Sequence, residues 1–143
     1  MKSLPTLFSL VTCVGLAFAG SGAVAQTWST PTKLSGKWTA PGSSNGQRLF
    51  VNLDPVSGTG ELSIAFSEDR CSIRGAPMTM AMLGGRITLK TAAGYASMCV
   101  DSMTLEMTPN PGPKGAIGYL GELRLTGSAA SRAPVLRGRL TEP

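Results

Sequence analysis

Apolar and polar residues alternate along most of the chain, in short segments that end at turn residues. In the clearest segment, Met103, Leu105 and Met107 share one face, while Thr104 and Glu106 share the other. A period of two is typical of antiparallel strands with one buried face. The pattern predicts strands over residues 34–39, 48–53, 61–66, 71–82 (with a bend at 75–77), 86–91, 99–108, 119–126 and 134–140.

Turn residues separate these segments, and none of the segments has the period of an amphipathic helix. Gly84-Gly85 predicts a tight hairpin because both positions tolerate positive φ. Asn110 to Gly118 is rich in proline and glycine and predicts a long loop. Short connections favour a meander, so we expect an all-β fold, a small antiparallel up-and-down β-barrel of about eight strands. The interior of such a barrel holds side chains or one small ligand.

The N-terminal segment has the three parts of an export signal. Lys2 is followed by an apolar run from Leu7 to Ala19 and by small residues ending at Ala25, so we expect cleavage before Gln26. The apolar run is shorter than the ~20 residues that span a bilayer, although an uncleaved anchor is the alternative. The expected product is periplasmic or secreted, without a transmembrane segment.

Three regions are therefore expected. Residues 1–25 form a signal peptide, 26–33 an extended N-terminal arm, and 34–143 a single β-barrel domain. Cys13 leaves with the signal, and an even pair of cysteines in an oxidising compartment predicts one disulfide, between Cys71 and Cys99. Free thiols for redox or metal chemistry are the rival interpretation, but the chain has no C-x-x-C spacing.

The composition excludes several classes of enzyme. There is no histidine, which removes imidazole bases and most zinc sites. The string Gly42–Gly46 matches G-x-S-x-G, but it joins two strands and is expected to be a turn. Adjacent Glu68 and Asp69 diverge, and Asp101 and Glu106 fall on opposite strand faces. We therefore expect no enzymatic activity, no cofactor and no metal site.

The first predicted strand contains Gly36-Lys37-Trp38. It resembles the opening strand of the calycin-type barrels, the lipocalin and avidin-like families, which carry Gly-x-Trp there. The resemblance implies a β-barrel. It does not extend to biotin binding, because Ala40 stands where the avidin-like pattern has asparagine and Phe66 where it has tyrosine.

In lipocalin-like barrels an arginine of the last strand covers the first-strand tryptophan. The resemblance therefore implies that Arg137 or Arg139 lies within about 6 Å of the Trp38 ring, as a cation–π contact.

Two functions fit these expectations. In the first, the exported barrel is a non-enzymatic binding module that holds a small apolar ligand, lined by Trp38, Met80 and Met103. In the second, the interior is solid, and an envelope or inhibitor-type protein binds an extracytoplasmic partner through its loops. The surfaces to test for the second function are the arm from Gln26 to Lys33 and the Asn110–Gly118 loop.

Methionines and arginines suggest two further ligands. Met78, Met80 and Met82 share one strand face, and Met103 and Met107 another, which suits either Cu(I) binding or core packing, with packing favoured. Basic residues near the C-terminus suggest a patch for anionic envelope polymers or simply a solvent face. Nucleic acid is not expected as a partner, because no basic run is interleaved with aromatics. The basic residues are Arg124, Arg132, Arg137 and Arg139.

Overall fold

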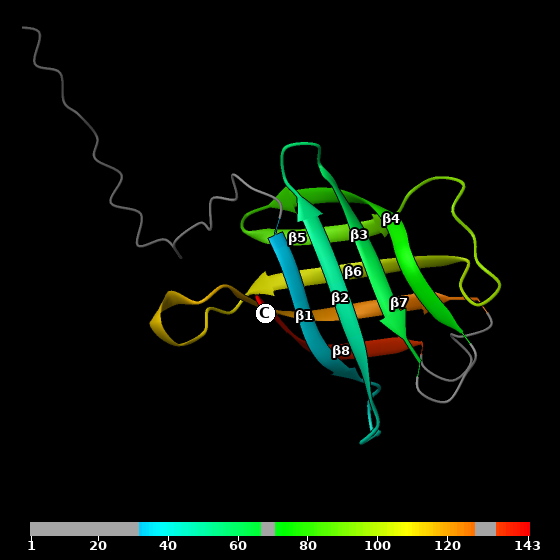
Figure 1. Cartoon of the computed structure of the whole chain (residues 1–143), viewed down its shortest axis with the longest axis horizontal. Coiled ribbons are helices and arrows are strands. Elements are labelled where there is room, and N and C mark those ends of the chain that lie inside the picture. Colours follow the sequence, from blue (N-terminus) through cyan, green and yellow to red (C-terminus); the bar gives the residue numbers. More distant parts are fainter. Residues whose placement is uncertain (1–31, 67–70, 128–133) are drawn as a thin grey trace, which may run out of the picture.

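A computed structural model describes residues 32–66, 71–127 and 134–143. Within these ranges eight strands form a closed barrel, and one short 3-10 helix lies in the loop between the sixth and seventh strands (Figure 1). The signal peptide, most of the arm and the residues Glu68, Asp69 and Arg132 lie outside the described residues. The elements are β1 (Thr32–Thr39), β2 (Gly46–Asp54), β3 (Thr59–Ala65), β4 (Ser72–Leu83), β5 (Arg86–Thr91), β6 (Ser102–Pro109), η1 (Pro113–Gly115), β7 (Gly118–Thr126) and β8 (Val135–Thr141).

Each strand pairs antiparallel with the next one along the chain, and β1 pairs with β8 to close the barrel. The predicted all-β, up-and-down barrel is therefore confirmed. β5 has the predicted bounds, whereas β1 begins at Thr32, so that the last two residues of the expected arm belong to the strand. β6 begins after Asp101, which is exposed.

The bend predicted in the fourth strand is a local irregularity in pairing. The register between β3 and β4 shifts between Leu62 and Ile64, and Gly75 has a φ of 60°. The Gly75 N–H donates a hydrogen bond to Ser63 Oγ at 2.8 Å. A glycine at this position allows the left-handed backbone that lets the strand curve around the barrel.

The conformations of two turns are explained by the residues that they contain. Gly84 and Gly85 have φ values of 58° and 80°, the two positive values of the predicted tight hairpin. The turn after β2 is held by Asp54, whose carboxylate accepts hydrogen bonds from the N–H groups of Val56 and Ser57 at 3.1 and 3.3 Å. The Ser57 side chain has the largest effect on the pKa of the Asp54 carboxyl and, with the N–H groups of Ser57 and Val56, holds it below its ordinary value.

The inward faces of all eight strands meet in one apolar core. Alternation along each strand sends apolar side chains inward and polar ones outward, as the sequence predicts. The largest fully buried side chains include Trp38 and Tyr119. The buried hydrophobic residues of the strands are Leu34, Trp38, Leu49, Val51, Leu53, Leu62, Ile64, Ile73, Ala76, Met78, Ile87, Leu89, Met103, Leu105, Met107, Tyr119, Leu123, Leu125, Leu136 and Leu140.

The antiparallel order divides the connections between the two ends of the barrel. One end, here called the arm end, carries the start of β1, turns 55–58 and 84–85, loop 110–117 and the last residues of the chain (Figure 1). The other, the disulfide end, carries connections 40–45 and 92–101, together with Phe66, Cys71, Gly127 and Pro134, the described residues next to the ends of β3, β4, β7 and β8. The described part of the chain contains no helix that is long and apolar enough to cross a membrane.

Candidate functional site

The three residues expected to line a ligand all lie on the inner side of the barrel. Trp38 is 0% exposed and Met103 1%, and Met80 is partly buried against the same core. The interior around them is occupied by side chains from every strand. Close packing of this kind is typical of a protein core and leaves little room for a ligand.

Trp38 lies across the strands that close the barrel. Its ring packs against Gly138 of β8, its register partner, and reaches Gly121 of β7, which pairs with Gly138. A Cβ on Gly121 would lie 2.9 Å from Cη2 of the indole. The indole Nε1 is buried and has no hydrogen-bond partner among the described residues. The indole ring therefore stabilises the fold through packing against the backbone of Gly121 and Gly138.

The expected arginine cover of this tryptophan is wrong. Because Gly138 faces inward under the ring, its neighbours Arg137 and Arg139 face the outside of the sheet. Arg137 Nε donates to Glu122 Oε2 at 2.9 Å, and Arg139 binds Asn110. The cation–π contact found among the described residues is that of Arg48 with Phe50.

The methionines divide between the core and the surface. Met78, Met103 and Met107 are buried, while Met82 and Met98 are 48% and 99% exposed. Within the described ranges, no group of three or more histidine, cysteine or acidic side chains is arranged to hold a metal ion. The placement of the buried methionines favours the packing interpretation over Cu(I) binding.

The predicted disulfide between Cys71 and Cys99 is confirmed, with Cα atoms 5.9 Å apart. Cys71 immediately precedes β4, and Cys99 belongs to the long connection between β5 and β6. The bond therefore ties two neighbouring connections at the disulfide end. Ser97 orders the same connection, since its Oγ accepts from the N–H of Val100 at 3.0 Å.

Loop 110–117 is a braced projection at the arm end (Figure 1). The Asn110 N–H donates to the Gly118 carbonyl, and the Gly112 N–H to the Ala116 carbonyl, each at 2.8 Å. Arg139 donates two hydrogen bonds to Asn110 at the base of the loop, from Nη1 to Oδ1 at 3.0 Å and from Nη2 to the backbone carbonyl at 2.9 Å.

The tip of this loop has an unusual backbone. Lys114 is exposed and has a φ of 59°, the one positive φ at a non-glycine residue in the described part of the chain. A lysine held in this conformation costs free energy, which the braced base of the loop offsets.

Apolar side chains protrude at the same end of the barrel. Val56 is 81% exposed in the turn between β2 and β3, and Leu83 is 86% exposed at the hairpin between β4 and β5. The Met80 N–H donates to the Gly58 carbonyl at 2.9 Å and joins the first turn to β4. Neither residue is among the site residues predicted from the sequence; the signal that could have found them is an apolar residue inside or beside a turn motif.

Ion pairs occupy the outer wall of β7 and β8. Glu122 accepts from Arg124 Nε at 2.7 Å and from Arg137 Nε at 2.9 Å. These bonds, with that from Arg137 largest, hold the pKa of the Glu122 carboxyl below its ordinary value. Arg124 and Arg137 thus share one carboxylate, and Arg139 is bonded to the uncharged Asn110.

Three hollows lie along described residues, and none of these three is lined by Trp38, Met80 or Met103. A hollow of about 460 Å³ lies on β2, β3 and β4, near Glu61 and Pro77. One of about 450 Å³ lies over the Glu122 ion pairs, and one of about 580 Å³ beside the hairpin of β4 and β5.

In comparisons with known proteins, no family model, no curated protein and no solved structure matches this chain.

Proposed function

We propose that the protein is an exported, non-enzymatic interaction module, whose barrel is a rigid frame and whose arm end binds a partner protein. The observation that carries this proposal is the close-packed interior around Trp38, which favours recognition by the outside of the barrel over storage of a ligand inside it. The same architecture supports a calycin-like fold, as the Gly36-Lys37-Trp38 motif implies. Disulfides form in oxidising compartments, which supports a periplasmic or secreted location.

The arm end is favoured because it gathers features suited to protein recognition. Val56 and Leu83 offer exposed apolar surface, and Lys114 stands at the tip of a braced loop. The strand β1 also begins at this end, so the chain before Thr32 joins the barrel there. Preformed loops lose little conformational entropy on binding, which favours affinity for a partner.

Site-specific photocrosslinking in the native host tests the proposal. A photoreactive amino acid is placed at Leu83 and at Lys114 on the arm end, and at Met98 on the disulfide end as a control of matched exposure. We expect a discrete adduct with one protein from the two arm-end positions and none from Met98. Adducts from Met98 alone, or no adduct from any position, would contradict the proposal.

A further inference from the structure

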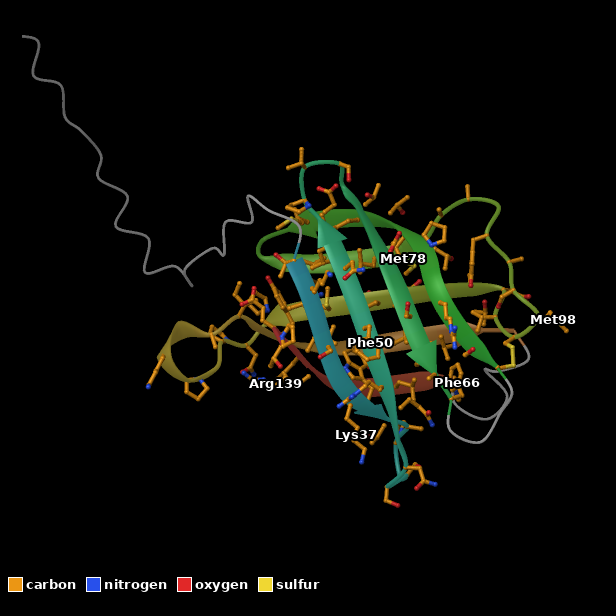
Figure 2. All side chains as sticks on the ribbon, viewed as in Figure 1. Lys37, Phe50, Phe66, Met78, Met98 and Arg139 are labelled. Carbon is orange, nitrogen blue, oxygen red and sulfur yellow. A yellow bond between two sulfur atoms is a disulfide. The ribbon has the colours of Figure 1, made fainter. Side chains whose placement is uncertain are left out.

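The outer wall of β1 and β2 carries cations beside an exposed aromatic ring. Lys33, Lys37, Arg48 and Phe50 point outward there, and we call these four residues the basic face. Lys37 stands directly opposite Arg48 in the strand register. Phe50 is 47% exposed, and Figure 2 shows it on the same side of the barrel as Lys37.

No acidic side chain of the described residues neutralises these cations. The ion pairs of the barrel use Arg124 and Arg137, both on Glu122. Lys33 faces the uncharged Asn52 in the register, and Glu61 lies one strand further on in the same row. Like charges directly opposite one another on neighbouring strands destabilise a sheet. An anion bound outside the wall would remove this repulsion.

The two facing cations lean apart along the sheet. The stem of Lys37 lies over Gly46, where a Cβ would collide with it. The guanidinium of Arg48 lies over the Phe50 ring, 5.9 Å from its centroid. Positive charges therefore surround the Phe50 ring on the outer surface of the sheet. The residues opposite Phe50 on the two neighbouring strands are small, Ser35 and Ser63, so the ring projects above them.

We propose that the basic face docks on an anionic lipid surface. Lysine and arginine near a negatively charged bilayer bind its headgroups, and an aromatic ring among them enters the interface between headgroups and acyl chains. None of the four residues of the basic face lines one of the three hollows described above, so a broad, fluid surface suits these residues better than a compact ligand. This proposal is independent of partner binding at the arm end.

Vesicle sedimentation tests the proposal with the purified protein. One vesicle preparation is phosphatidylcholine alone, and in the other phosphatidylglycerol replaces half of it. We expect binding to the anionic vesicles only, weakened by added salt. The double variant K37Q/R48Q is expected to lower the partition coefficient by roughly 25-fold, at about fivefold for each cation removed. The control R86Q/K90Q removes the same charge from β5, across the barrel, and leaves the coefficient within about twofold of the original.

A fluorescent variant tests the position of the ring. In Phe50→Trp, the added indole is expected to shift its emission to the blue on anionic vesicles and to be quenched by brominated acyl chains. Equal binding to both kinds of vesicle, no binding at all, or equal losses in the two double variants would overturn the proposal. An unquenched indole at position 50 would do the same.

Discussion

The indole of Trp38 rests directly on the backbone of Gly138, its partner in the pairing that closes the barrel. A Cβ built on Gly138 would lie 2.6 Å from Cγ and Cδ1 of the ring. Such a separation is shorter than any ordinary contact between carbon atoms. The absence of a side chain at this position therefore makes room for the largest residue of the core at the seam between first and last strands.

We predict that Gly138→Ala destabilises the fold. The added methyl group forces the indole or the β8 backbone to move, and overpacking of this kind costs about 1–3 kcal/mol. Urea unfolding followed by circular dichroism measures the change. Ser35→Ala, on the outer wall of β1, is the control and is expected to change the free energy of unfolding by less than about 0.5 kcal/mol.

A double-mutant cycle tests whether the cost at Gly138 comes from the tryptophan. Trp38→Ala alone removes buried contacts and lowers the free energy of unfolding. In the Trp38→Ala background, Gly138→Ala is expected to cost less, because the ring atoms Cγ and Cδ1 that the methyl group would meet are gone. Strictly additive costs would show that the clash lies elsewhere.

The disulfide is predicted to supply a large part of the stability. Cys71 and Cys99 are separated by 28 positions, and a closed loop of that size stabilises a fold by about 3–4 kcal/mol on the chain-entropy account. The variant C71S/C99S is expected to lose that amount in urea unfolding. Reduction of the original protein should reproduce the loss but leave C71S/C99S unchanged, and a loss below about 1 kcal/mol would contradict the prediction.

Arg139 is predicted to set the rigidity of the projecting loop. Arg139→Lys keeps the positive charge but loses the bidentate hydrogen bonding to Asn110. Amide hydrogen exchange is expected to accelerate at Gly112, whose N–H is bonded within the loop, while β2 is unaffected. Arg137→Lys, which changes a surface ion pair instead, is the control and should leave exchange at Gly112 as it was.

The Glu122 ion pairs predict a pH dependence. Because its folded pKa lies below the ordinary value of 4.5, ionised Glu122 stabilises the fold above that pH, and this contribution disappears as the pH falls through the lowered pKa. Glu122→Gln should therefore be less stable than the original protein at neutral pH and equal to it in strong acid. Thermal unfolding across this pH range measures the difference. Glu61→Gln, which breaks no described ion pair, should show no such convergence.

Alternation and turn chemistry were sufficient to predict the barrel. Met103, Leu105 and Met107 follow a period of two and lie in the core, and Gly84-Gly85 forms the expected hairpin. Strand bounds were less accurate, since β1 extends back to Thr32 through pairing with Leu53 that local composition does not reveal.

Contacts between residues far apart in the chain could not be predicted from the sequence. The expected contact of Arg137 or Arg139 with Trp38 is wrong because strand parity turns both arginines outward. The partner of Arg139, Asn110, lies 29 positions away in the sequence. The pairing of Lys37 with Arg48 likewise depends on the register between β1 and β2. A register can be fixed only when both strands and their connection are known.

Native mass spectrometry of the protein, isolated from its native host, tests the central claim most directly. If the interior is filled and the protein binds through its outer surface, the spectrum should show the chain alone or the chain in complex with another protein. It should release no small molecule when the chain is unfolded in the gas phase. A small apolar compound bound in fixed ratio, and lost only on unfolding, would contradict the account and restore the barrel lumen as the binding site.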